Sequence, residues 1–380
     1  MVYSLTMFGK MFMDSSRHNA YVQALRQVVV EGSVVLDIGT GTGIYALLAC
    51  QLGARRVYAL DVNPLISLAR ELAAANGFAD RIEFIEALSS EVTLVERADV
   101  IVADLRGTLP FYGQNLPSLD DARRRHLAPG GTLIPRRDEV HAAVVTAPGA
   151  EEAIFGPWLR NPLHLDMRAA ARMAANTLRS EIVTAEQLLT ESHQVAVIDY
   201  LQITTPDLHA HWSVPVVRAG TAHGISVWFD ASPAEGITYT TGPGAGRTIY
   251  GTGFLPLETP VELTLGDHVD ISLHAILDED YVWAWSFTAR DEFGSQKVAL
   301  SQSTLHSVAL SRRALQRRSA RFVLGDANAV SVDLVALQCL RSGASLGEVA
   351  NTLLDQFPNR FGSWALALTH AADLAEKYVG

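Results

Sequence analysis

Residues 34–43 have the sequence VVLDIGTGTG, and this stretch decides the fold of the first part of the chain. Its apolar start predicts a buried strand, its glycines predict a tight turn, and the following segment IYALLACQLGA at 44–54 predicts a helix. Glycine leaves room for a ligand close to the backbone, and the N–H groups at a helix N-terminus present positive potential. We therefore expect a nucleotide-like ligand to bind at this strand-to-helix turn.

The alternation of strands and helices continues beyond the turn. RRVYALDVNP at 55–64 predicts a second strand, and residues 65–77 predict a helix that ends at a glycine. RIEFIEA at 81–87 and ADVIVADLRG at 98–107 predict a third and a fourth strand. Strands that alternate with helices at this spacing predict an α/β fold with a doubly wound, Rossmann-like parallel sheet, placed at 33–146.

The pattern changes after residue 146. Segments such as GISVWFDA at 224–231 and YVWAWSFTAR at 281–290 alternate apolar and polar residues, which is typical of antiparallel sheet. We therefore expect an antiparallel β-sandwich or β-barrel domain at 147–298, interrupted by a helical insertion near 157–180. From 299 to 380 the pattern is helical again.

Composition narrows the possible functions. The chain has 380 residues, which predicts two or three domains, and its 41 acidic and 30 basic residues give a net charge of −11. This charge argues against general nucleic-acid binding through phosphates. No apolar stretch is long enough for a membrane span and no signal-peptide pattern is present, so a cytoplasmic protein without a membrane partner is expected. The two cysteines predict buried free thiols, and the histidines lack metal-ligand spacing, so no metal site is expected.

The glycine turn has a specific spacing. Gly39, Gly41 and Gly43 alternate with single residues, and Asp37 precedes the first of them by two positions. Asp61 ends the second strand, where a carboxylate can accept hydrogen bonds from ribose hydroxyls. Together they resemble motif I of the class I S-adenosylmethionine-dependent methyltransferases, which implies a methyltransferase (EC 2.1.1) with S-adenosyl-L-methionine as cofactor. The alternative is a purely structural glycine turn in another α/β protein.

A second stretch resembles the protein arginine methyltransferases in particular. That family has Met-Leu-x-Asp-x-x-Arg-x-x-x-Tyr before motif I, and MFMDSSRHNAY at 11–21 keeps the Met, Asp, Arg and Tyr positions. The resemblance implies that Arg17 holds the carboxylate of the cofactor's methionine moiety, and that the helical segment 1–32 lies over the cofactor. We also expect Ser89 and Ser90, which follow the third strand, to bind the cofactor.

The resemblance extends over about residues 5–290, but the substrate loops differ. The family's two loop glutamates, which clamp a substrate guanidinium, fall on Asp104 and Gly113. The family's Thr-His-Trp loop falls on the sequence TIY at 248–250. A single carboxylate cannot reproduce a clamp made of two acids. The sequence therefore predicts an acceptor other than peptidyl arginine.

Asp104 is the candidate catalytic residue, because it follows the fourth strand at the edge where α/β sheets place their ligands. It would orient an amine, amide or hydroxyl, and the alternative role is to cap the next turn. Arg106 stands where the family has methionine, and it could pair with Asp104 or contact a substrate carboxylate. The candidate acceptor-pocket residues, each of which could instead be packing, are Tyr21, Arg106, Tyr112, Gln114 and Tyr250.

These observations lead to three hypotheses for function. The first is methyl transfer to nitrogen or oxygen of a biosynthetic small molecule or a peptide, as in natural-product pathways. The second is N-methylation of arginine or another guanidine, free or in a protein. The third is a non-catalytic, cofactor-binding scaffold.

Partners are predicted from the two helical regions. The insertion near 157–180 lies where the family has its dimerisation arm, which implies a homodimer. The region 299–380 weakly resembles winged-helix domains that capture a leader peptide by strand addition, so a leader peptide or carrier is a possible partner. A plain helical extension is the alternative for the same region.

Overall fold

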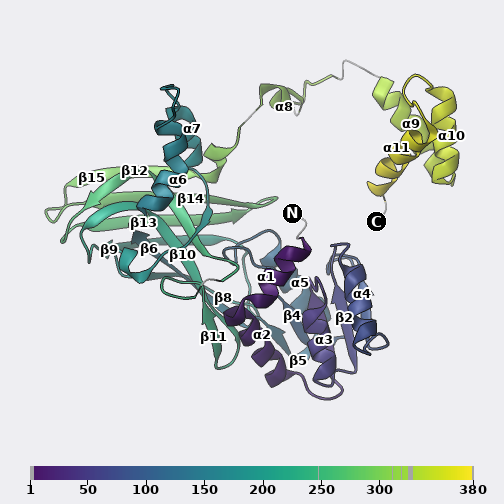
Figure 1. Cartoon of the computed structure of the whole chain (residues 1–380), viewed down its shortest axis with the longest axis horizontal. Helices are drawn as coiled ribbons and strands as arrows, with labels where there is room; N and C mark the ends of the chain where they lie inside the picture. The colour runs from purple at the N-terminus through teal and green to yellow at the C-terminus, as the bar shows by residue number, and fades with distance from the viewer. Residues whose placement is uncertain (1–3, 247, 310, 318, 324–327, 379–380) are drawn as a thin grey trace. The chain divides into compact units, whose positions relative to one another are not determined.

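The computed structural model describes residues 4–246, 248–309, 311–317, 319–323 and 328–378. The chain forms two compact units, Met1–Val308 and Ala309–Gly380 (Figure 1). Among the described residues, no helix is long and apolar enough to cross a membrane. Both cysteines are free thiols; Cys50 is buried and Cys339 is half-buried.

Five parallel strands form the first sheet, in the order β3-β2-β1-β4-β5. The strands are β1 (Val34–Ile38), β2 (Arg56–Leu60), β3 (Ile82–Ile85), β4 (Ala98–Ala103) and β5 (Leu127–Ile134). The connecting helices are α3 (Ile44–Gln51), α4 (Ile66–Ala75) and α5 (Asn115–His126). The predicted doubly wound sheet is confirmed. The glycine turn follows β1 and Asp104 follows β4, so both lie at the carboxyl edge where the strand order reverses.

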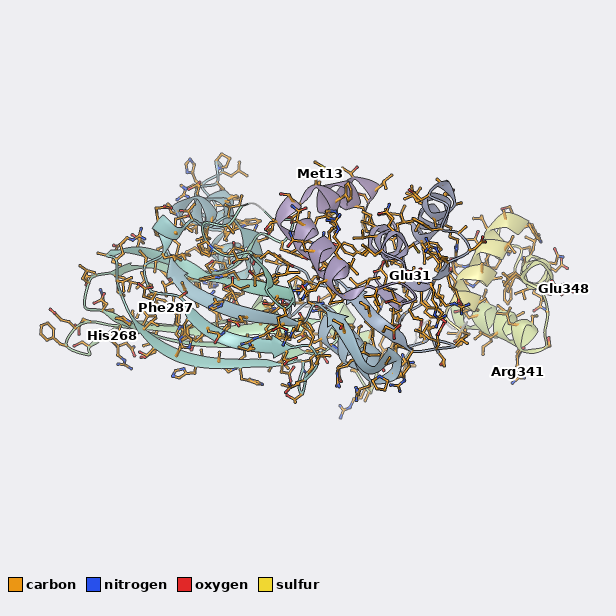
Figure 2. The ribbon with its side chains drawn as sticks, turned by 90° about the horizontal axis from the view of Figure 1, so that it is seen from below. Met13, Glu31, His268, Phe287, Arg341 and Glu348 are labelled. Atoms are coloured by element: carbon orange, nitrogen blue, oxygen red, sulfur yellow. The ribbon has the colours of Figure 1, made fainter. Side chains whose placement is uncertain are left out.

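Two helices precede the sheet, α1 (Leu5–Met13) and α2 (Ser15–Val28). Asp14 caps α2, since its carboxylate accepts a hydrogen bond from the Arg17 backbone N–H at 3.3 Å. Helix α2 buries Tyr21 and Leu25 against the sheet core. Helix α1 has no buried residue, and Met13 at its end is 77% exposed (Figure 2).

Antiparallel strands make the second part of the first unit. One sheet has the order β7-β12-β10-β6-β8, with β11 paired to β10, and the other has the order β15-β14-β13-β9. The strands of the first are β6 (Arg137–Val145), β7 (Arg179–Glu181), β8 (His193–Asp199), β10 (Gly220–Ala234), β11 (Ile237–Thr240) and β12 (Thr252–Leu263). The strands of the second are β9 (Leu208–Pro215), β13 (His268–Leu277), β14 (Tyr281–Arg290) and β15 (Gln296–Ser303). The predicted barrel domain is confirmed, and Phe287 on β14 is fully buried in its core (Figure 2).

Two predicted domain boundaries differ from the strand pairing. The boundary at 146/147 places β6 in the parallel domain, whereas β6 pairs with β8 and β10 of the barrel. The boundary at 298/299 divides β15, which pairs with β14 up to Ser303. The apolar and polar pattern of each strand is compatible with both of the neighbouring domains. The strands with which it forms hydrogen bonds determine the domain to which it belongs.

The helical insertion begins earlier than predicted. It consists of α6 (Pro148–Leu159) and α7 (Arg168–Ala174) and leads into β7. Pro148 occupies the first turn of α6, where its missing N–H costs nothing, so the helix begins there and not near residue 157. Two short 3₁₀ helices, η1 (Ala185–Gln187) and η2 (Thr304–Ser307), complete this unit.

The second unit has helices α8 (Arg312–Arg317), α9 (Asn328–Arg341), α10 (Leu346–Gln356) and α11 (Trp364–Glu376). The last three surround a small apolar core that includes Ala336, Leu353 and Ala371. The described residues of this unit contain no strand, so they offer no sheet edge for the strand addition by which winged-helix domains capture a peptide. The described residues of the second unit form helices α8 to α11.

Candidate active site

A cavity of about 420 Å³ opens at the carboxyl edge of the parallel sheet. Its walls come from α1 and α2, the glycine turn, the ends of β2 and β4, and the loop before β12. The lining residues with polar or aromatic side chains are Phe8, Phe12, Arg17, His18, Asp37, Thr40, Thr42, Tyr45, Asp61, Asn63, Asp104, Arg106, Tyr112 and Tyr250.

The turn after β1 requires glycine for two reasons. Gly39 and Gly41 have φ values of +74° and +55°, which side chains with a Cβ rarely adopt. A Cβ on Gly39 would lie 2.6 Å from Leu105 Cδ2, and one on Gly41 would collide with the Phe8 ring. The Gly41 N–H donates to Asp61 Oδ2 at 2.7 Å, which joins the turn to the end of β2.

Asp37 is a buried acid beneath this turn. Its Oδ2 accepts hydrogen bonds from Thr40 Oγ1 at 2.7 Å and from the Ala46 N–H at 3.1 Å. Burial raises the pKa of Asp37 to about 7, with the Asp61 carboxylate adding to the rise, although the two hydrogen bonds oppose it. Folding therefore favours the protonated form of the Asp37 carboxyl group.

Asp37→Asn should change the pH dependence of stability. Between pH 4 and pH 7 the unfolded wild-type chain releases the Asp37 proton while the folded chain keeps it, so wild-type stability falls as pH rises. The variant has no such proton, and its amide oxygen can accept both hydrogen bonds. We expect the free energy of unfolding of the variant, minus that of the wild type, to increase as the pH rises across this interval. Urea denaturation measures both values. Parallel curves for the two proteins would contradict the assignment.

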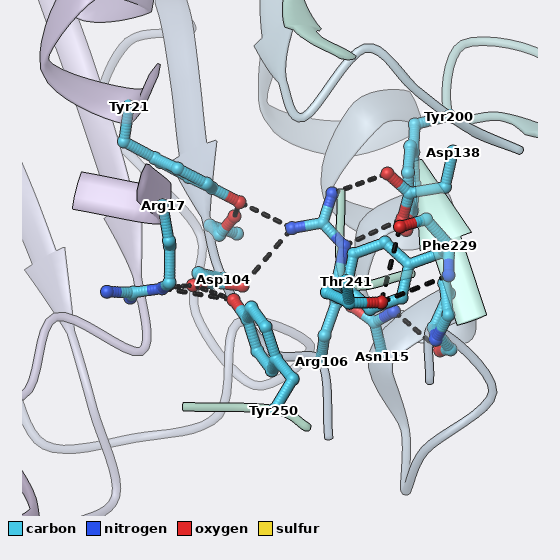
Figure 3. Close-up of polar contacts among 12 residues, drawn as sticks. Arg17, Tyr21, Asp104, Arg106, Asn115, Asp138, Tyr200, Phe229, Thr241 and Tyr250 are labelled. Atoms are coloured by element: carbon cyan, nitrogen blue, oxygen red, sulfur yellow. Dashed lines mark hydrogen bonds and ion pairs between the residues drawn. The ribbon is translucent and has the colours of Figure 1, made fainter. Parts of the chain in front are cut away.

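Asp104 lies beside Arg17 and Tyr250 (Figure 3). Its Oδ2 accepts from the Tyr250 hydroxyl at 2.5 Å and forms an ion pair with Arg17 Nε. Arg17 Nε also lies 3.0 Å from the Tyr250 hydroxyl, and its Nη1 donates to the Met11 carbonyl at 3.1 Å. Three segments distant in sequence thus meet at one carboxylate.

Arg106 holds the other side of Asp104. Its Nη1 donates to Asp104 Oδ1 at 3.1 Å and to the Tyr21 hydroxyl at 2.6 Å. Its Nε and Nη2 form a bidentate pair with Asp138 on β6, at 2.7 and 2.8 Å. The Tyr200 hydroxyl donates to Asp138 at 2.6 Å. Asp138, Arg106, Asp104 and Arg17 therefore form a buried chain of alternating charge, which we call the charge chain.

The charge chain controls the protonation of Asp104. Burial alone would raise the pKa of Asp104, but the Arg17 and Arg106 guanidiniums and the Tyr250 hydroxyl outweigh it and hold that pKa below its usual range. Asp104 is consequently ionised at neutral pH. It can accept hydrogen bonds and orient a ligand, and it is a weak base.

Asp14 connects the cofactor side of the cavity with the barrel side. One of its carboxylate oxygens caps α2 below Arg17, and the other accepts from the Ile249 N–H at 2.7 Å. Ile249 precedes Tyr250 in the loop before β12. This single acid therefore positions both Arg17 and Tyr250.

Most of the residues predicted from the sequence meet at this cavity. The lining includes Arg17, Asp37, Gly39, Asp61, Asp104, Arg106, Tyr112 and Tyr250. Other predicted residues lie outside the lining as described, and they are Tyr21, Gly41, Gly43, Ser89, Ser90 and Gln114. Of these, Tyr21 is buried behind the cavity and donates to the Ala103 carbonyl, while Ser90 and Gln114 are exposed. Their roles stay predictions.

The sequence did not single out Tyr45 and Asp138, two residues that matter at this site. Tyr45 follows the last glycine of the turn by two positions, and this placement could have suggested it. Asp138 lies 32 residues beyond Arg106 in a barrel strand, and only the tertiary structure brings the two together.

Two family models match the chain. The model described as ribosomal protein L11 methyltransferase matches residues 19–134, and the model described as arginine methyltransferase oligomerization subdomain matches residues 137–311. The chain is a class I, protein arginine methyltransferase-like protein. The two matches correspond to the parallel sheet and the barrel.

Curated relatives support the same family. The chain is 30% identical over 248 residues to probable protein arginine N-methyltransferase 6 of Arabidopsis thaliana, covering 61% of this chain and 57% of that relative. It is 28% identical over 302 residues to protein arginine N-methyltransferase 6 of Danio rerio, covering 73% of this chain and 86% of that relative. The chain thus spans little more than half of the Arabidopsis relative.

Solved structures show the same fold. Protein arginine methyltransferase 10 of Arabidopsis thaliana superposes with a TM-score of 0.69 at 23% identity, covering 79% of this chain and 97% of that one. The Trypanosoma brucei PRMT1 enzyme-prozyme heterotetrameric complex with AdoHcy gives a TM-score of 0.71 at 21% identity, with 79% and 98% coverage. These likenesses confirm the predicted two-part fold.

Proposed function

We propose that this chain is an S-adenosylmethionine-dependent methyltransferase whose acceptor is a guanidino nitrogen of arginine or a related guanidine, in a protein or free. The observation that supports this most is the position of Asp104, an ionised carboxylate at the end of β4 that faces the same cavity as the glycine turn. The names of the relatives favour an arginine acceptor over the small-molecule acceptor expected from the sequence.

The residues of the cavity fit the cofactor. Gly39 and Gly41 have no Cβ that would collide with Leu105 and Phe8, so the turn can keep its positive-φ backbone, and Gly39 lines the cavity. Asp61 offers carboxylate oxygens for a ribose diol, and the Tyr45 hydroxyl is buried without a hydrogen-bond partner among the described residues. S-adenosylmethionine, when bound, supplies an electrophilic methyl group on its sulfonium. Arg17 would hold its carboxylate, as the resemblance implies.

Asp104 would hold the acceptor. A guanidino N–H can donate to Asp104 Oδ2 once Arg17 turns toward an anionic ligand, because Oδ2 is the oxygen that Arg17 contacts. This hydrogen bond aims the nitrogen lone pair at the methyl carbon, and positioning is the main contribution such a site makes to transfer. In the transfer the methyl–sulfur bond would break, leaving a neutral thioether, and the proton released from the attacking nitrogen would pass to water. Since the pKa of Asp104 is held low, Asp104 mainly orients the nitrogen.

A neutral nitrogen or oxygen acceptor, as in the small-molecule hypothesis, is the second candidate. The observation that favours it is the charge chain, in which Arg17 and Arg106 already balance Asp104 and Asp138. The second acid of the family clamp is replaced by Gly113, which has a φ of +46° and no side chain. A cationic guanidinium substrate would therefore find only the Asp104 carboxylate there, and Asp104 already forms ion pairs with Arg17 and Arg106.

Asp61→Ala should weaken cofactor binding. Its carboxylate is the only acid at the end of β2, and the alanine variant loses both the acceptor for the Gly41 N–H and the acceptor for ribose. We expect isothermal titration to show at least tenfold weaker binding of S-adenosylhomocysteine, the demethylated cofactor product. Asp61→Asn, which keeps one acceptor oxygen, should lose less. Wild-type protein that does not bind this nucleoside would contradict the proposal.

The two acceptor candidates can be separated with radiolabelled cofactor. Free arginine, arginine-containing peptides and other guanidines form one group of acceptors, and neutral amides, hydroxyl compounds and anilines form the other. Radiolabelled methyl groups found only on acceptors of the first group support guanidine methylation. Label that appears only in the second group supports the neutral acceptor.

Assembly and the role of the second unit stay proposals. We propose a homodimer through the helices α6 and α7, because this insertion lies within the region matched by the oligomerization subdomain model. Recognition of a leader peptide or carrier by the second unit is a prediction from the sequence alone.

A further inference from the structure

Tyr45 occupies a fixed place at the cavity. It is the second residue of α3 and lines the cavity directly beyond the glycine turn. Its ring stacks on Tyr21, with centroids 5.2 Å apart and planes 14° apart, and on His18, with values of 6.2 Å and 17°. These two ring contacts limit the freedom of the Tyr45 ring and so set the direction of its hydroxyl.

The Tyr45 hydroxyl is buried and has no hydrogen-bond partner among the described residues. A buried polar group without a partner is uncommon and unfavourable, because it has lost its hydrogen bonds to water. Two neighbouring tyrosine hydroxyls do have partners: that of Tyr21 meets Ala103 and Arg106, and that of Tyr250 meets Asp104. An unpartnered hydroxyl in the wall of a binding cavity points to a ligand.

The surroundings of Tyr45 indicate which ligand group its hydroxyl accommodates. Burial raises the pKa of this phenol strongly, and the nearby Asp104 and Asp37 carboxylates add to the rise, while Arg17 opposes it. The phenol is therefore protonated and acts as a hydrogen-bond donor. Arg17 is the cation named among these influences, and its guanidinium is also a donor in the cavity. Two donors, one of them cationic, make a subsite for an anionic group.

We propose that the Tyr45 hydroxyl donates a hydrogen bond to the carboxylate of the cofactor's methionine moiety, beside Arg17. This inference rests on the proposed function, because it assumes that the cofactor occupies the cavity. Before Arg17 turns toward the ligand, its Nε and Nη1 contact Asp104, Tyr250 and Met11, so the Tyr45 hydroxyl is a donor that the carboxylate can meet without breaking an existing contact. Tyr45 is then a cofactor-binding residue. It binds the methionine carboxylate together with Arg17, whereas the family resemblance implies Arg17 alone.

Tyr45→Phe tests the proposal, because it removes the oxygen and keeps the stacked ring. Binding is measured by isothermal titration with S-adenosylhomocysteine, which has the carboxylate, and with 5′-methylthioadenosine, which lacks the whole amino-acid moiety. We expect the variant to bind S-adenosylhomocysteine about tenfold or more weakly, as for a lost hydrogen bond to a charged group, and to bind 5′-methylthioadenosine as the wild type does. Tyr58→Phe is the matched control, since Tyr58 is buried in β2 outside the cavity lining as described.

Two results would overturn the proposal. If Tyr45→Phe binds S-adenosylhomocysteine with wild-type affinity, its hydroxyl does not contact the carboxylate. If it loses affinity for both nucleosides equally, the effect comes from the ring or the turn. Failure of the wild type to bind either nucleoside would overturn the proposed function itself, which separates the two cases.

Discussion

Arg106→Met should lower the free energy of unfolding of the first unit by about 3–5 kcal/mol, the usual cost of removing one partner of a buried ion pair. The Arg106 side chain is 1% exposed and the Asp138 side chain 0%. Methionine fills similar volume but leaves the Asp138 carboxylate buried with only the Tyr200 hydroxyl as a hydrogen-bond partner among the described side chains. Urea denaturation followed by tryptophan fluorescence measures the change, since five of the six tryptophans lie in this unit.

A double variant shows whether charge is the cause. Arg106→Met combined with Asp138→Asn removes both charges and keeps an acceptor for Tyr200, so it should recover much of the lost stability. Arg290→Met breaks an exposed ion pair with Asp270 and should cost about 1 kcal/mol or less. A double variant as unstable as Arg106→Met alone would show that packing, and not the unpaired carboxylate, accounts for the loss.

Asp104→Asn should reduce methyl transfer by about 100-fold or more, the effect typical of losing a preorganised electrostatic contact at a reacting centre. Asparagine keeps the shape of the side chain but not the charge that holds and orients the acceptor. Binding of S-adenosylhomocysteine should not weaken, because Arg17 loses its ion pair with Asp104 and becomes freer to meet an anion. Initial rates with labelled cofactor and titration calorimetry separate these two effects.

Asp104→Glu is the matched control for that experiment. It keeps the carboxylate and adds one methylene, as in the family loop that the sequence resembles, so it should retain more activity than the asparagine variant. Unchanged turnover in Asp104→Asn would remove Asp104 from the reaction. Loss of cofactor binding in that variant would assign Asp104 to the cofactor site.

Much of the fold could be predicted because its determinants are local. The stretch VVLDIGTGTG contains a strand, a turn and the start of a helix. The barrel strands can be recognised from the alternation of apolar and polar residues in each one, without knowing the strand with which it pairs. The limits of β6 and β15 were missed because strand pairing, and not the pattern of a single strand, decides which sheet a segment joins. The second unit was ambiguous since short amphipathic helices occur both alone and in winged-helix domains.

The site could be predicted only in part. Arg17, Asp61 and Asp104 follow from motifs with fixed spacing, and all three line the cavity. Asp138 has no such motif, because its importance depends on the distant Arg106. The sequence placed Arg106 near Asp104 but left open whether it would pair with that acid or contact substrate, and the structure shows the pair.

The charge chain also limits the order in which its members could have been acquired. The family that the sequence resembles has methionine at the position of Arg106. An arginine that arrives before Asp138 stays charged in the interior, because a guanidinium does not give up its proton in proteins. An aspartate that arrives first can take up a proton and remain neutral until its partner appears. Homologues with arginine at position 106 are therefore expected to have an acid at position 138, because Asp104 alone would leave Arg106 Nε and Nη2 without their acceptors.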